Sequence, residues 1–292
     1  MAFSDRDARR PASSIGRGRP RLSDAETERR MLSTAAEALS REGLTVSLDH
    51  IRLEDVIREA GVSRSTAYRR WPSKEQFLGD LLLELARASV PMAATGSAEA
   101  SHGIRAVVLE HLGLLKTESG RIQLAATVLR DVAAQDFHRI LASPQWRTYL
   151  ALTVSAVGMP EGPLRTQVQE TLAASEQAFI EGIAQSHRMV TTLLGLRIRP
   201  ETGLTFERLA HLGNAVMRGL ITQAMVTPSL SEDRVDGEVF GAHGSWSLPA
   251  LGAVAVTVGY LEPDPDVAWT RAMTTRLRRR LESGTDFLAG EE

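Results

Sequence analysis

The sequence contains no cysteine, and this absence excludes disulfide bonds, cysteine-ligated zinc and thiol catalysis. It has no uninterrupted apolar run near the roughly 18 residues that a membrane-spanning helix requires. The N-terminal residues also lack the hydrophobic stretch of a secretion signal. We therefore expect a cytoplasmic protein that has no membrane partner.

The composition is that of a folded protein, since 43% of the 292 residues are hydrophobic and 24% are charged. The length suits one large domain or two ordinary ones. The formal net charge of −2 hides an asymmetry, because residues 1–74 hold 15 basic and 11 acidic side chains whereas the remainder holds 19 and 25. A basic end on an acidic body predicts a local anionic partner, of which nucleic acid is the usual candidate.

The basic side chains are densest near the N-terminus, where five arginines and no acid lie within residues 8–22. Arginine makes up 32 of the 34 basic residues of the chain, a bias that explains the choice of arginine over lysine but not the clustering. Because residues 1–22 have almost no large apolar side chains, we expect them to be a disordered basic arm.

A helix-turn-helix pattern follows this arm. A first helix begins at Ser23 or Asp24 and ends before Gly43, and a short second helix covers about residues 53–60. The sequence AGVS then occupies residues 60–63, where Gly61 permits a sharp turn and Ser63 can cap the next helix, Arg64–Arg70.

The third of these helices is too polar for a core element. Only Ala67 and Trp71 are plausible inward residues, and the other positions carry hydrogen-bonding or cationic side chains suited to base edges and phosphates. In a helix-turn-helix the second helix of the pair lies in the DNA major groove. DNA binding is therefore favoured over the alternative, a buried structural helix pair.

The segment LEDVIREAGVSRSTAYRRWPSKEQFL, residues 53–78, resembles the DNA-binding domain of TetR-type (TetR/AcrR) transcriptional regulators. The resemblance covers about residues 24–88. The matching positions are Val56–Ile57, Ala60–Ser63, Tyr68, Trp71, Ser73–Lys74 and Leu78. The chain departs from the family pattern in having Ile57 and Ala67 where Ala and Leu are usual, Trp71 in place of Phe, and a connector before Val56 that is about four residues longer.

The resemblance implies an all-α fold in two parts. A three-helix DNA-binding domain would cover residues 23–89, and a larger helical domain for regulation and dimerisation would cover residues 104–292. Tyr68 and Lys74 would bind phosphates. The candidates for reading base edges are Arg64, Ser65, Thr66 and Arg69. The full set of expected DNA-binding residues is Arg17, Arg19, Arg21, Arg52, Ser63, Arg64, Ser65, Thr66, Tyr68, Arg69 and Lys74.

The arginines of the N-terminal arm have a more specific interpretation beside such a domain. The sequence RGRP, residues 17–20, resembles the core of an AT-hook, whose arginines enter the narrow minor groove of A·T-rich DNA. The alternative is a solvated tail that adds only diffuse attraction.

Beyond a boundary at residues 90–103, the pattern predicts helices joined by loops. The expected helices cover residues 104–116, 121–134, 145–157, a long stretch after Pro163, 205–226 and 264–282. The polar, glycine-rich stretch 227–247 is predicted to be a loop. Residues 248–258 are equally consistent with a helix and with a buried strand.

Two further expectations come from the resemblance: a dimer through the last long helices and a small-molecule cavity. The dimer would use apolar stripes that contain Leu172, Phe179, Ile183, Leu209, Val216 and Leu220, although a monomer core could use the same stripes. Candidate ligand contacts are the semi-polar residues of apolar segments, each of which could equally be core or surface: His111, His138, Trp146, Tyr149, Met159 and Met189. No histidine pair has metal-binding i, i+4 spacing, so no metal or other cofactor is predicted.

We therefore predict a DNA-binding transcriptional regulator, a homodimeric repressor released from a palindromic operator by a small hydrophobic effector. The alternatives are a constitutive repressor and an architectural DNA-binding protein without an effector. An enzyme is not expected, because the sequence has no glycine-rich phosphate loop, no nucleophile elbow and no useful His–carboxylate motif.

Overall fold

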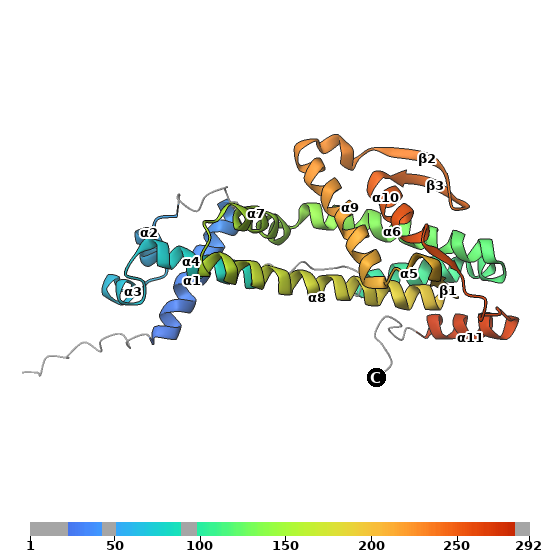
Figure 1. Ribbon diagram of the computed structural model, residues 1–292, viewed down its shortest axis with the longest axis horizontal. Coiled ribbons are helices and arrows are strands. Elements are labelled where there is room, and N and C mark those ends of the chain that lie inside the picture. Colours follow the sequence, from blue (N-terminus) through green and yellow to red (C-terminus); the bar gives the residue numbers. More distant parts are fainter. Residues whose placement is uncertain (1–22, 43–50, 89–97, 284–292) are drawn as a thin grey trace, which may run out of the picture.

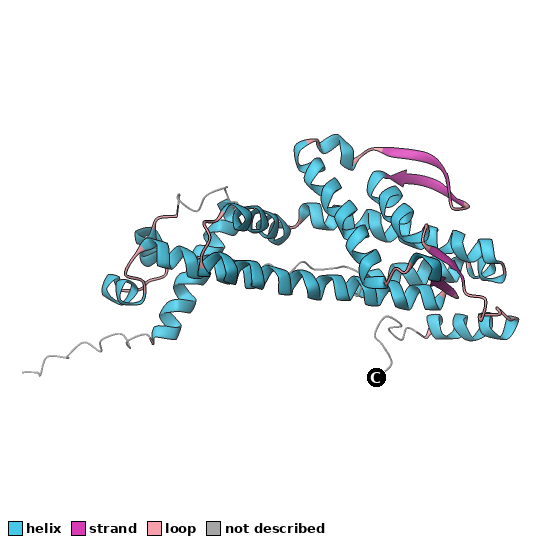
Figure 2. Cartoon of the chain, viewed as in Figure 1, coloured by secondary structure: helices cyan, strands magenta, loops and turns pink. Residues whose placement is uncertain are grey.

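The structure is a computed structural model that describes residues 23–42, 51–88 and 98–283. The molecule is elongated, with the helices that follow the arm at one end and a larger helical body at the other (Figure 1). Helices make up most of the chain, as predicted, and a few short strands accompany them (Figure 2). No helix in the described part combines the length and apolarity needed to cross a membrane. The arm residues Arg17, Arg19 and Arg21 and most of the long connector lie outside the described residues.

The first four helices follow the sequence signals closely. They are α1 (Asp24–Glu42), α2 (Leu53–Glu59), α3 (Arg64–Arg70) and α4 (Lys74–Ala88). The Ser23 hydroxyl accepts a hydrogen bond from the Glu26 amide at the start of α1, and Ser63 caps α3 in the same way through the Thr66 amide. Gly61 adopts a φ of +64° in the turn between α2 and α3, a left-handed conformation that favours glycine.

The core of this end draws on both halves of the chain. Trp71 and Phe77 are completely buried beside Met31 of α1. The same apolar cluster takes in side chains of α7 (Pro144–Gly158) and α8 (Pro163–Leu193), which are Tyr149, Leu152, Ala156, Val168 and Leu172. Helix α4 approaches α8 closely, since a Cβ added to Gly79 would lie 3.3 Å from a methyl carbon of Leu164. This end of the molecule therefore shares its core with the body.

The body is built from seven helices of the described residues, most of which have a capped N-terminus. Besides α7 and α8 they are α5 (Ala98–Glu110), α6 (Glu118–Ala142), α9 (Phe206–Val226), α10 (Leu248–Val258) and α11 (Arg271–Glu282). Short 3-10 turns cover Leu112–Lys116, Pro200–Thr202 and Pro228–Ser231. Serine or threonine caps the start of five of these helices, through Thr117, Ser143, Thr205, Ser247 and Thr270.

The prediction of a loop over residues 227–247 was wrong. This stretch contains a β-hairpin in which β2 (Arg234–Val239) pairs antiparallel with β3 (Ala242–Ser247). Phe240 and Gly241 form its two-residue turn with φ values of +50° and +78°, the geometry that hairpin turns prefer. Phenylalanine is unusual in that conformation, so the turn lacks its ordinary sequence signal.

The structure also decides one open alternative and corrects the bounds of two helices. Residues 248–258 form a helix, and α5 begins at Ala98 and ends at Glu110 instead of covering 104–116. The last helix begins at Arg271 and not at Asp264–Pro265, because β4 (Leu261–Pro263) pairs with β1 (Leu196–Ile198). The Asp264 carboxylate then accepts a hydrogen bond from the Asp266 amide at 3.0 Å, which makes a turn there.

Candidate nucleic-acid interface

Helix α3 presents one polar face to solvent. Ala67 and Trp71 are completely buried, whereas Arg64, Ser65 and Arg69 are exposed and Tyr68 is 42% exposed. The inward residues are those that the sequence indicated. The small Ala67 side chain and the bulky Ile57 of α2 lie in the same core cluster.

Hydroxyl groups order the start of α3. The Ser63 hydroxyl lies 2.7 Å from that of Thr66 and 3.1 Å from that of Ser65, in addition to accepting the Thr66 amide. Thr66 is half-buried, while Ser65 remains exposed. Ser63 and Thr66 therefore stabilise the helix terminus, and Ser65 is the hydroxyl presented to a partner.

The carboxylate of Glu54 on α2 holds two of the expected DNA contacts. It accepts hydrogen bonds from the Arg64 guanidinium, with Nε at 2.8 Å and Nη2 at 2.6 Å, and from the Tyr68 hydroxyl at 2.7 Å. The bonds from Tyr68 and Arg64 lower the pKa of Glu54 below its ordinary value, and the same carboxylate raises the pKa of Tyr68. Glu54 therefore stays charged at neutral pH and occupies the groups that DNA would use.

The other two arginines of α3 have different surroundings. Arg69 pairs with Asp24 at the start of α1 at 2.6 Å, and both side chains are largely exposed. Arg70 lies between Glu28 at 3.1 Å and Asp80 at 2.9 Å, and its guanidinium stacks 5.1 Å from the Trp71 ring centroid. Arg70 is thus part of the packing, whereas Arg69 stands at the surface.

Two cations flank α3 on neighbouring elements. Arg52 is exposed at the N-cap position of α2. Lys74 is the first residue of α4, whose start is capped by a 3.4 Å hydrogen bond from the Gln76 amide to the Ser73 hydroxyl. Arginine, lysine and helix N-termini are the groups that commonly bind DNA phosphates. The candidate interface among the described residues therefore consists of Arg52, Arg64, Ser65, Tyr68, Arg69 and Lys74.

This arrangement defines a helix-turn-helix DNA-binding domain: two short helices, a tight turn and an exposed row of donors on the second helix. Residues 31–81 match the family model for bacterial regulatory proteins of the tetR family. This match supports a DNA-binding transcriptional regulator of the TetR family. None of the curated proteins matches the chain.

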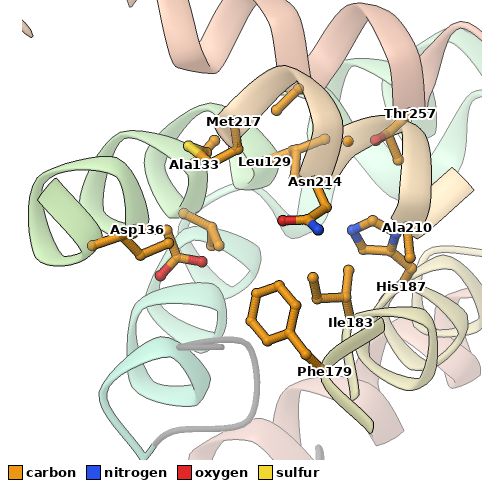
Figure 3. A pocket seen from close by; sticks show the side chains of 14 residues that line it. Leu129, Ala133, Asp136, Phe179, Ile183, His187, Ala210, Asn214, Met217 and Thr257 are labelled. Atoms are coloured by element: carbon orange, nitrogen blue, oxygen red, sulfur yellow. The ribbon is translucent and has the colours of Figure 1, made fainter. Parts of the chain in front are cut away.

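The body contains two adjoining cavities, one of about 70 Å³ between α6, α8, α9 and α10 and one of about 50 Å³ between α5, α6, α8 and α10. His187 of α8 and Thr257 of α10 line both of them. Asp136 of α6 and Asn214 of α9 add polar groups to the larger one, whose remaining lining is apolar (Figure 3). The signal for His187 and Asn214 was present in the sequence, since each interrupts an apolar helical stripe.

None of the expected ligand contacts lines either cavity. His111 bonds through Nδ1 to the Val107 carbonyl at 3.0 Å, and His138 is exposed. Trp146 is buried in a separate small cluster. The remaining three, Tyr149, Met159 and Met189, pack into or against the two larger cores. The Tyr149 hydroxyl is occupied in addition, because it donates to Glu176 at 2.7 Å.

Most of the side chains expected at a dimer interface pack wholly or partly inside the protomer. Leu209 is completely buried, and Leu172 and Phe179 are each only 7% exposed. Ile183, Val216 and Leu220 are half-buried. On α9 the outward positions are instead taken by residues such as Leu212, Ala215 and Gly219, and on α8 by Ala174, Ala178 and Gly182.

Proposed function

We propose that this chain is a homodimeric repressor that binds a palindromic operator and is released by a small-molecule effector. The observation that carries the DNA-binding part of this proposal is the exposed donor row of α3. Its side chains project from a helix whose other face is fixed by completely buried Ala67 and Trp71. Regulators of this family are in general DNA-binding proteins and not enzymes.

In the proposed complex α3 lies in the major groove. Arg64 and Arg69 read base edges, where an arginine binds guanine through two hydrogen bonds. Tyr68, Lys74 and Arg52 contact phosphates on either side. The two α3 helices of a dimer would enter successive major grooves, separated by about one helical turn, or roughly 34 Å. Arg17, Arg19 and Arg21 of the N-terminal arm are proposed to enter the adjacent minor groove where the flanks are A·T-rich.

Selection of bound sequences from a random DNA pool with the purified protein tests this proposal directly. We expect enrichment of inverted half-sites at a fixed spacing, with A·T-rich flanks if the arm contributes. A pool that shows no enrichment would support the architectural alternative, since nonspecific binding rests on phosphate attraction alone.

The first prediction concerns Glu54. Replacing Glu54 with glutamine removes the negative charge that pairs with Arg64 and faces incoming phosphates. We expect the affinity for random-sequence DNA to rise roughly fivefold at moderate salt, and the ratio of operator to random affinity to fall. Fluorescence anisotropy with an operator duplex and a scrambled duplex measures both. Glu59→Gln, the same charge change at the other end of α2, is the control. If both variants gained the same affinity for DNA, the effect of Glu54→Gln would come only from the change in net charge.

The proposed dimer uses the outward faces of α8 and α9. A Cβ added to Gly182 or Gly219 would meet nothing within 4 Å, so these faces are open enough for close approach of a second protomer. Leu212 is 42% exposed on the same side of α9 as Ala215 and Gly219. An exposed leucine beside small residues is typical of a helix–helix contact with another chain.

Leu212→Glu therefore provides the second prediction. A glutamate there would be buried without a partner in the dimer, so we expect its dissociation constant to rise about a hundredfold or more. Analytical ultracentrifugation over a range of protein concentrations measures this shift. Val157→Glu, at a 71% exposed valine of α7, is the matched control and should leave the dimer intact. A dimer of unchanged strength in Leu212→Glu would place the interface elsewhere.

Effector release requires a connection between the cavities and α3. Helix α8 supplies one, because Val168 and Leu172 lie in the core shared with α3 and α4, while Ile183 and His187 line the larger cavity. Helix α4 adds a second through its close contact with α8 at Gly79 and Leu164. A ligand can shift the spacing of the two α3 helices only if it binds two conformations of the protein unequally.

A further inference from the structure

The two cavities of the body meet at His187, whose Nδ1 atom has no hydrogen-bond partner. The Nδ1 atom of His187 is buried and unpartnered. Burial of the ring also lowers the pKa of His187 to about 4, so the imidazole is neutral near pH 7. A neutral imidazole has one N–H donor and one lone pair, and leaving such a group unpaired inside a protein is unfavourable.

The amide of Asn214 lines the same cavity as His187. Figure 3 shows the His187 ring and the Asn214 side chain pointing toward one another across the larger cavity. Asn214 donates one amide hydrogen to Glu176 at 2.9 Å, which leaves its second amide hydrogen available. When the Nδ1 atom of His187 carries the lone pair, a single group between these two side chains has to donate a hydrogen bond to Nδ1 and accept one from the Asn214 amide. A hydroxyl does this, whereas a methyl, a carboxylate or an ammonium does not.

The charges around the larger cavity disfavour an ionic occupant. Its lining contains no lysine or arginine, so a carboxylate would meet no cation. Asp136 is the acidic residue of the lining, but it is paired with Arg139 at 3.3 Å and burial raises its pKa. The opposing walls are apolar and include the Phe179 ring and Ile183 (Figure 3). These surroundings suit an uncharged, mainly apolar molecule.

The space admits no molecule larger than one aromatic ring, and it admits such a ring only when side chains of the lining move. An apolar cavity of about 150 Å³ in another protein holds benzene. Each cavity here is smaller, at about 70 and 50 Å³, but they adjoin at His187 and Thr257. A ring would therefore occupy the larger cavity and displace the side chains that separate it from the smaller one.

We propose that this double cavity binds a small uncharged phenol, whose hydroxyl bridges His187 and Asn214 and whose ring packs on Phe179 and Ile183. The claim that such a phenol is the effector rests on the proposed function. The claim that the cavity binds a phenol rests only on the cavity and on the unpartnered Nδ1 atom of His187.

Isothermal titration calorimetry of the purified full chain with phenol, toluene, benzoate and benzylamine tests the site. Phenol and toluene have the same ring and differ only in that phenol has a hydroxyl where toluene has a methyl. The ratio of their affinities therefore reports the contribution of the hydroxyl, because the contribution of burying the ring is common to both. We expect His187→Phe to lower the phenol-to-toluene affinity ratio about tenfold. His138→Phe, at an exposed histidine of α6, should leave it unchanged. An unchanged ratio in His187→Phe, or tighter binding of benzoate or benzylamine than of phenol, would overturn the proposal.

A measurement on the unaltered protein keeps the test valid if His187→Phe does not fold. In nitrogen-15 histidine spectra, the imidazole that does not titrate between pH 5 and 8 should shift on addition of phenol and not of toluene. Operator affinity then separates the two proposals. Phenol that binds through His187 without weakening operator binding would refute effector release and leave the site standing. Release by another ligand, retained in His187→Phe, together with no binding of phenol would refute the site and leave effector release standing.

Discussion

Replacing Trp71 by alanine is expected to lower the free energy of opening of helices α1–α4 by about 3–5 kcal/mol. The Trp71 side chain is completely buried and meets the Phe77 ring edge-on, with centroids 5.2 Å apart. Its indole N–H donates to Asp80 at 2.8 Å, and the Arg70 guanidinium stacks on its face. Alanine would remove all three contacts and leave a cavity under the helix that reads DNA.

Hydrogen exchange resolved by mass spectrometry is the suitable measurement, because a chain of this size need not unfold in a single step. Amides of α2, α3 and α4 should lose protection, while those of α9 and α10 should keep theirs. Trp71→Phe is the control, since phenylalanine retains the aromatic packing and gives up only the N–H bond to Asp80. Unaltered protection of α2–α4 in Trp71→Ala would show that Trp71 does not organise this domain.

Alanine at Arg64 or at Arg69 should have the largest effect on operator binding. Each loss of a bidentate arginine–guanine contact removes about 1–3 kcal/mol of discrimination, or roughly 5- to 150-fold in affinity. The losses should appear on the selected operator and shrink on operators altered at the base that the arginine reads. Anisotropy titrations at fixed salt measure both.

Arg58→Ala is the matched control for this series. Arg58 is an exposed arginine of α2 that pairs with Asp55 of the same helix at 2.8 Å and does not belong to the α3 face. It should change affinity little and uniformly across sequences. If Arg64→Ala and Arg69→Ala behave like Arg58→Ala on every sequence, the two arginines contribute only general charge, and the assignment of base reading to α3 would have to be withdrawn.

The helix-turn-helix was predictable because its signals are local. Gly61 for the turn, Ser63 for the cap and the contrast between Ala67 and the polar face of α3 all lie within a few residues of one another. Each acts through a short-range cause: a left-handed φ, a side-chain bond to a helix amide, or the burial of one helical face. The bounds of α2 and α3 were therefore confirmed almost to the residue.

The rest of the molecule depends on contacts between distant residues. The hairpin of β2 and β3 was missed because Phe240 hides its turn and because Arg130 of α6 helps to hold it. The Arg130 guanidinium bonds to the His243 carbonyl at 3.0 Å and lies over the Trp246 ring. Apolar periodicity on α8 and α9 likewise shows that a face is covered, but not whether the same chain or a second protomer covers it. The pairing of Glu54 with Arg64 and Tyr68 could not be predicted either, because it depends on how the turn between α2 and α3 orients the two helices.

The core shared by α3, α4, α7 and α8 has a consequence for the modularity of this regulator. Helix α8 is 31 residues long, or about 45 Å, and its first half closes the hydrophobic core of the DNA-binding end. A fragment that stops after α4 would expose the surfaces that Leu152, Val168 and Leu172 cover. Helices α1–α4 therefore do not form a domain that could be separated from the rest of the chain. An exchange of operator specificity between relatives, by recombination or by protein engineering, would have to transfer α7 and the first half of α8 together with the first four helices. Otherwise the shared hydrophobic core between these helices would have to be redesigned.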